Sequence, residues 1–160
     1  MKTALPAAYL LTFRTYGSWL HGDARGSVHH REASYGAPLL RPSPRWEAAE
    51  RARLRGPAVL LSRPARDIVE QVIADVCAHR GWMLRAANAR TNHVHAVVSA
   101  AREPEAILVT VKAWATRRLV EAGRVQRGTH VWSRHGSTIY LWDERSVESA
   151  AWYVLYEQGE

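Results

Sequence analysis

Cysteine is almost absent from this sequence: Cys77 is the only one in 160 residues. A single cysteine excludes an internal disulfide and a zinc site built from cysteines. No stretch approaches the roughly 18 consecutive apolar residues that a membrane span requires. The opening stretch, MKTALPAAYLLTF, has one lysine and no convincing cleavage site, so it predicts a first strand rather than a signal peptide. From these absences we expect a cytoplasmic protein without a membrane partner.

Lysine is also scarce, although the chain is strongly basic. The formal net charge is +7, and every one of the 22 basic residues except Lys2 and Lys112 is an arginine. A planar guanidinium holds phosphate with two hydrogen bonds, but a GC-rich coding sequence also produces arginine, so the net charge is the stronger indicator. It favours a polyanionic partner.

The order of elements predicts a single domain over residues 1–160. Strands are expected at 9–16, 82–88 and 93–99, helices at 65–80 and 103–122, a hairpin from 131–132 and 138–142 around His135 and Gly136, and a last helix starting near Asp143 or Ser146. Residues 17–63 form a long insertion rich in Arg, Gly and Pro, with one helix at 45–55. Without the insertion and the last helix, the order is the split βαββαβ of a ferredoxin-like α+β domain, with helices on one face of the sheet.

Two histidines stand one residue apart in the stretch TNHVHAVV, residues 91–98. Alternation along a strand places His93 and His95 on one face, which suits a shared cation or a shared polar partner. Two imidazoles suit Zn, Mn, Co or Ni but need a further ligand. The alternative is a pair of core or surface histidines that bind nothing. Asn92, just before them, either orients one ring or is a turn residue.

The last helix offers further groups. Tyr153 and Glu157 are four residues apart and share a helical face. A phenol and a carboxylate beside two imidazoles would combine a nucleophile with a metal site. The alternative is that Trp152, Tyr153 and Tyr156 are core and boundary aromatics. Catalysis is favoured only if the histidine pair and the tyrosine with its carboxylate lie together.

The histidine pair lies in the stretch TNHVHAVVSA, and the tyrosine and the carboxylate lie in the C-terminal stretch YVLYEQG. The first resembles the His-hydrophobic-His strand of the HUH nucleases, and the second resembles the nucleophile helix of their single-tyrosine transposase branch, which includes the REP-associated tyrosine transposases. The flanking stretches that also resemble this branch are CAHRGWMLRAANARTNHVH, VKAWATRRLVEAG and VWSRHGSTIYLWDE. The resemblance spans about residues 5–159 and implies a ferredoxin-like fold with the histidine strand in the middle of the sheet.

The resemblance implies a role for each matching residue. His93 and His95 match the metal-binding histidines, and Tyr153 matches the nucleophile, with Tyr156 as the alternative nucleophile. In relatives a polar residue four positions after the tyrosine, often an amide, completes the metal site. Here that position is Glu157, a departure that makes Gln158 the alternative third ligand. The expected ion is Mg²⁺ or Mn²⁺.

The implied substrate is single-stranded or hairpin DNA, cut through a 5′-phosphotyrosine. The residues expected to contact DNA are Arg14, Trp19, Arg45, Arg117, Arg118, Arg124 and Arg134. The alternatives are that the tryptophan belongs to the core and that the arginines after 117 form a solvated helix end. A rival zinc cluster at His21, His29 and His30 lacks cysteine ligands.

The leading hypothesis is therefore a metal-dependent DNA strand transferase, an enzyme of the transposase class. Its alternatives are a non-cleaving DNA- or RNA-binding protein of transposase descent and a metal-dependent hydrolase that uses water. A homodimer that exchanges the tyrosine helix is possible in this family, so assembly of the site within one chain or between two stays open.

Overall fold

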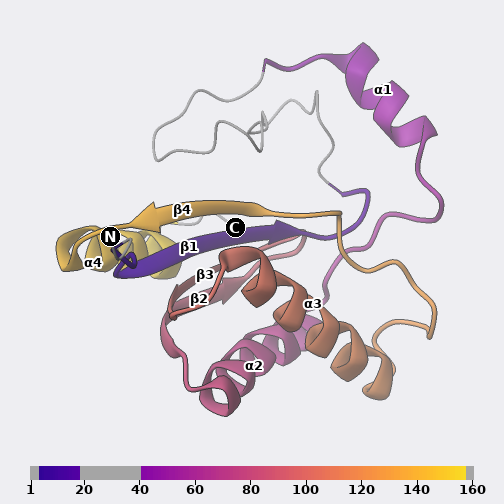
Figure 1. Ribbon diagram of the computed structural model, residues 1–160. Helices are drawn as coiled ribbons and strands as arrows, with labels where there is room; N and C mark the ends of the chain where they lie inside the picture. Colours follow the sequence, from indigo (N-terminus) through magenta and orange to yellow (C-terminus); the bar gives the residue numbers. More distant parts are fainter. Residues whose placement is uncertain (1–3, 19–40, 158–160) are drawn as a thin grey trace.

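The computed structural model describes residues 4–18 and 41–157, which form an α+β arrangement (Figure 1). The elements in chain order are β1 (Ala8–Arg14), α1 (Pro44–Ala52), α2 (Arg63–Arg80), β2 (Met83–Ala89), β3 (His93–Ser99), α3 (Pro104–Glu121), β4 (Ser137–Leu141) and α4 (Glu144–Tyr156). With α1 and α4 set aside, this is the predicted βαββαβ order, and the expected helices and strands are confirmed to within a few residues at their ends.

The four strands form one antiparallel sheet in the order β2-β3-β1-β4. The interior positions of β1 and β3 agree with their sequences, because both are dense apolar runs that are buried along most of their length. The more exposed β2 and β4 form the edges. The histidine strand therefore lies inside the sheet, as expected.

One face of the sheet carries the main core. Tyr9, Leu11 and Phe13 alternate along β1 toward α2 and α3, which lie side by side against this face (Figure 1). The buried side chains that α2 and α3 contribute are Ala65, Val69, Val72, Ile73, Val76, Cys77, Ile107, Leu108, Val111, Ala115 and Leu119. Many of these residues are spaced three or four positions apart, as on the core-facing side of an amphipathic helix.

The ends of α2 and α4 follow the capping signals in the sequence. The Ser62 side chain accepts a hydrogen bond from the Ala65 amide at the start of α2, and Gly81 ends that helix with a φ of 70°. Asp143 caps α4 by accepting from the Ser146 amide at 2.8 Å. Of the two predicted starts of the last helix, Asp143 is the observed N-cap.

The predicted hairpin between residues 131–132 and 138–142 is wrong. β4 pairs with β1, and Trp132 forms a bridge with Thr15, just after the end of β1, so both parts of the segment lie along β1 instead of pairing with each other. The segment between them, residues 133–136, is held in place by Lys112 of α3. Its Nζ donates to Ser133 O at 3.0 Å and also to His135 O. Burial of this ammonium lowers the pKa of Lys112.

Glycine is required at the end of this segment. A Cβ built at Gly136 would lie 2.6 Å from the Thr12 carbonyl oxygen, so no other residue allows the chain to approach β1 this closely. His135, before it, has a φ of 63°, in the left-handed region. The His-Gly pair was predicted to form a hairpin turn. Instead, it belongs to the short irregular segment that separates the Trp132 bridge from β4 along the same partner strand.

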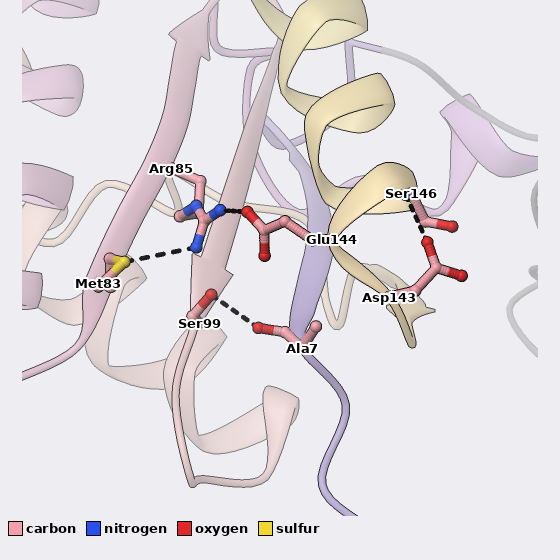
Figure 2. Close-up of polar contacts among 7 residues, drawn as sticks. All are labelled: Ala7, Met83, Arg85, Ser99, Asp143, Glu144 and Ser146. Carbon is pink, nitrogen blue, oxygen red and sulfur yellow. Dashed lines mark hydrogen bonds and ion pairs between the residues drawn. The ribbon is translucent and has the colours of Figure 1, made fainter.

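Among the described residues, α4 is the helix that covers the opposite face of the sheet. The buried residues of this second cluster are Ala8, Leu10, Ala86, Val97, Leu141, Val147, Ala150 and Val154. At the start of α4, Arg85 of β2 forms an ion pair with Glu144, beside the Asp143 cap (Figure 2). Such a partly exposed ion pair is worth about 0–1 kcal/mol, so the apolar contacts hold most of the helix in place.

None of the helices in residues 4–18 and 41–157 is both long and apolar enough to cross a membrane.

Candidate active site

The face under α4 changes from apolar to polar across one row of the sheet. Leu10 and Val97 are paired in register, and both belong to the apolar cluster under α4. One step further along, His95 of β3 pairs with Thr12 of β1 on one side and with Asn88 of β2 on the other. Cross-strand neighbours point to the same face, so Thr12, His95 and Asn88 form a polar row at the edge of the apolar patch.

The two histidines lie together on this face, as their spacing predicts. Their ring centroids are 4.9 Å apart at an interplanar angle of 77°. His95 is 9% exposed, and its Nδ1 lies 2.7 Å from Thr12 Oγ1. His93 is half-buried, and its Nδ1 lies 2.7 Å from Asn92 Oδ1.

These contacts decide which ring atom can bind a cation. An amide oxygen only accepts hydrogen bonds, so the His93 Nδ1 that faces Asn92 Oδ1 carries the proton, and Nε2 is then the nitrogen suited to a metal ion. The Thr12 hydroxyl both donates and accepts hydrogen bonds, so its contact with the His95 Nδ1 is compatible with the same tautomer. Asn92 also lies in the bend between β2 and β3, where the Arg90 amide donates to His93 O at 2.8 Å. It is therefore both a turn residue and a hydrogen-bonding neighbour of the His93 ring.

Tyr153 is the tyrosine of α4 that reaches the histidine pair. Its ring centroid is 6.0 Å from that of His95, with an interplanar angle of 70°, and its half-buried side chain packs against the small apolar cluster. The next residue, Val154, accepts a hydrogen bond from Asn88 Nδ2 through its carbonyl at 2.9 Å. The phenol predicted as the nucleophile and the paired imidazoles thus meet within one chain.

The other aromatics of α4 do not belong to the core. Trp152 and Tyr156 are 59% and 66% exposed and contact each other, with ring centroids 4.4 Å apart. The core reading is therefore wrong for these two residues. Tyr156 remains the alternative nucleophile of the prediction, but the ring contact with His95 is made by Tyr153.

The third metal ligand stays a prediction. Within residues 4–18 and 41–157, no three side chains of His, Cys, Asp or Glu come together in a group that could hold an ion. Glu157 follows α4 directly, is exposed, and donates its backbone amide to Tyr153 O at 3.1 Å. Gln158 lies outside the described residues. Two adjacent imidazoles with hydrogen-bonded Nδ1 atoms fit a transition ion as two of its ligands and require at least one more.

The arginines predicted to bind DNA are divided between the two faces of the sheet. Arg14 pairs in register with His93 and so belongs to the polar face. Arg117 and Arg118 lie on α3, across the sheet from the histidines, and Arg118 Nη2 is 3.2 Å from Asp75 Oδ2.

Of the remaining predicted DNA contacts, Arg45 is on α1, and Arg124 and Arg134 are exposed residues of connecting segments. Residues 19–40 of the long insertion, which include Trp19 and the rival histidines His21, His29 and His30, lie outside the described residues.

Sequence reasoning missed two polar partners, Thr12 and Asn88. Thr12 interrupts the apolar run of its strand, and Asn88 is a polar residue in a strand otherwise rich in alanine. Either signal could have marked a polar patch. Only the register shows that both are the direct neighbours of His95.

Comparison with family models finds no match, and comparison with curated proteins finds none either. Among solved structures, the chain is similar to a REP-associated tyrosine transposase bound to a REP hairpin. The TM-score is 0.47 at 8% sequence identity, over 96% of this chain and 68% of the other. Because the similarity is this distant, the role of each residue has to be argued from the contacts of this chain itself.

Proposed function

We propose that this chain is a ferredoxin-like, metal-assisted DNA strand transferase of the single-tyrosine HUH class. The observation that carries the proposal is the contact between the rings of Tyr153 and His95, 6.0 Å apart, beside the second histidine of the pair. A phenol, two imidazoles with oriented rings and a strongly basic chain are the parts that transesterification of a phosphodiester requires.

The reaction transfers a phosphoryl group from sugar to protein. The phenol oxygen of Tyr153 attacks the phosphorus, the bond from phosphorus to the 3′ oxygen breaks, and the 3′ oxygen takes up a proton as the phenol loses one. The products are a 5′-phosphotyrosine and a free 3′-hydroxyl. Because the covalent link keeps the energy of the broken bond, a 3′-hydroxyl from another end can reverse the step without ATP.

His93 and His95 would hold the divalent ion, Mg²⁺ or Mn²⁺, with Glu157 or Gln158 as a further ligand. Such an ion supplies a positive charge that withdraws electron density from a non-bridging phosphate oxygen. The hydrogen bonds of Thr12 and Asn92 at Nδ1 fix the orientation of the two rings, and each Nε2 would then serve as the metal ligand. Arg14, across from His93, adds a guanidinium suited to the neighbouring phosphate.

The substrate is DNA with an unpaired stretch next to a hairpin. Tyr153 is held by its helix against the sheet, so the scissile phosphate has to come to this face of the protein rather than the tyrosine reaching into a duplex. A single strand can be splayed onto such a surface, whereas a regular duplex keeps both backbones wound.

The test is a covalent trapping experiment. Hairpin DNA with a labelled single-stranded extension is incubated with the protein and Mn²⁺, and the products are separated in SDS. We expect a labelled adduct that is lost in Tyr153→Phe and retained in the matched control Tyr156→Phe. DNA binding without cleavage would instead identify a non-cleaving nucleic-acid-binding protein. Cleavage without an adduct would identify a hydrolase that uses water.

A further inference from the structure

We propose that Asn88 is a positioning residue for the tyrosine: its hydrogen bond to Val154 O sets how Tyr153 approaches His95. The inference rests on the proposed function and adds a residue that neither the histidine motif nor the tyrosine motif contains. It concerns the place of the helix that carries the nucleophile, not the chemistry of the attack.

Asn88 connects the two halves of the site through a single side chain. Its backbone is the register partner of His95 on β2, and its Nδ2 donates to Val154 O at 2.9 Å. Val154 is the residue directly after Tyr153. This hydrogen bond thereby links the strand residue beside His95 to the helix residue that follows Tyr153.

The hydrogen bond acts at the part of α4 that needs it most. Carbonyl groups in the last turn of a helix lack the amide donors that the continuing helix would supply, and such turns fray. The apolar contacts of α4 also end here, because Val154 is fully buried while Leu155 and Tyr156 are 46% and 66% exposed. The Asn88 amide therefore supplies a donor to a carbonyl of the last turn and fastens that turn to the sheet.

The opposite end of α4 is fastened separately. Asp143 caps the helix, and Glu144 pairs with Arg85 (Figure 2). A helix of 13 residues is about 20 Å long, so these contacts act far from Tyr153. They fix the position of the first turn of α4, whereas Asn88 fixes the position of the last turn, which contains Tyr153, relative to the sheet. A small rotation of that turn moves the phenol oxygen, and a displacement of about 1 Å can cost roughly 100-fold in rate.

The experiment compares variants at the two ends of the helix. Asn88→Ala removes the tether, Asn88→Asp keeps the shape without the donor, and Asn88→Gln restores a donor on a longer arm. Glu144→Gln, which breaks the exposed ion pair, is the matched control. Adduct formation is followed in single turnovers at saturating hairpin DNA, and DNA affinity is measured in parallel. Hydrogen exchange of the amides after Tyr153 is measured on the DNA-free protein.

We expect the adduct rate to fall about 10- to 100-fold in Asn88→Ala and Asn88→Asp, because the phenol is misplaced, with DNA affinity within about twofold of wild type. Asn88→Gln should recover part of the rate, and Glu144→Gln should stay near wild type. Amides of the last turn should exchange faster only in the Asn88 variants. If Asn88→Ala folds poorly, Asn88→Asp and Asn88→Gln carry the comparison.

Two results would overturn the inference: an adduct rate in the Asn88 variants equal to that of wild type, or unchanged exchange in the last turn. Failure of the proposed function looks different, because wild type itself would then form no adduct. In that case the catalytic part of the inference fails as well, and hydrogen exchange alone still decides whether Asn88 holds the helix.

Discussion

The two faces of the sheet differ in what they bury. Toward α2 and α3, the strands present large side chains such as Leu11 and Phe13, which meet two long helices. Toward α4, much of the cluster is alanine, including Ala8 and Ala86, and in the described part of the chain one helix covers it. Buried apolar area is the main source of folding free energy, so the first face stabilises the fold.

The second face has a different consequence. Its apolar patch ends at the row that contains His95, and the polar groups there need only the thin cover of α4. A site at the edge of a small cluster can keep its histidines accessible to a substrate without opening the main core. The separation predicts that stability and adduct formation respond to different substitutions.

The largest loss of stability is expected for Ile73→Ala on α2. This side chain is fully buried in the main core, and its truncation should lower the free energy of unfolding by about 2–5 kcal/mol. Urea denaturation measures the loss, and the adduct yield per folded molecule should stay unchanged. A reduced yield in the folded fraction would show that the two faces are coupled.

A smaller loss of stability and a larger loss of activity are expected for Val154→Ala on α4. Removing two buried methyl groups should cost roughly 1–2 kcal/mol. The last turn of the helix should then loosen, and the adduct rate should fall. Val147→Ala, at the other end of the same helix and equally buried, is the control that should lose similar stability with little change in rate. Equal rates in both variants would contradict a special role for the last turn.

A still smaller effect, dependent on pH, is expected at the start of α4. The hydrogen bond from the Ser146 amide holds the pKa of the Asp143 carboxyl below its ordinary value. The stability that this shift contributes is present above about pH 4, the ordinary value for Asp, and is lost as the pH falls through the lower folded-state pKa. The urea midpoints of wild type and Asp143→Ala should therefore differ at pH 7 and converge in acid. A constant difference would show that the ionised carboxylate contributes nothing.

The smallest expected response is that of Cys77 to changes under α4. Burial raises the pKa of this thiol to about 11, so at pH 8 the native protein should react very slowly with iodoacetamide. Ile73→Ala, in the same core, should speed the reaction, and Val154→Ala should leave it unchanged. Faster alkylation in Val154→Ala would mean that the two faces open together.

Much of the fold was predictable because its signals are local. The apolar stripe of α2 lies between a Ser62 cap and Gly81, and the strand with His93 and His95 is a short, mostly apolar run. The hairpin prediction failed because His135 and Gly136 look like a turn, whereas the partner of both flanking segments is β1, more than a hundred residues away in sequence. Local turn chemistry does not specify that partner.

The site was predictable in the same uneven way. The period of a strand places His93 and His95 on one face, and a motif resemblance directs attention to Tyr153. It does not show that Tyr153 contacts His95 while Tyr156 packs on Trp152, and it does not show that Arg117 and Arg118 lie across the sheet from the histidines. Those distinctions depend on how α3 and α4 pack against the sheet.

The sequence by itself determined which residues share a face and where the helices begin and end, because both follow from backbone periodicity and from capping within a few residues. Only the tertiary structure decided that Thr12 and Asn88 flank His95 and that Tyr153 stands beside it. Those contacts arise from the register of three strands and the docking of one helix, and register depends on groups that are distant in the chain and meet only when the sheet is formed.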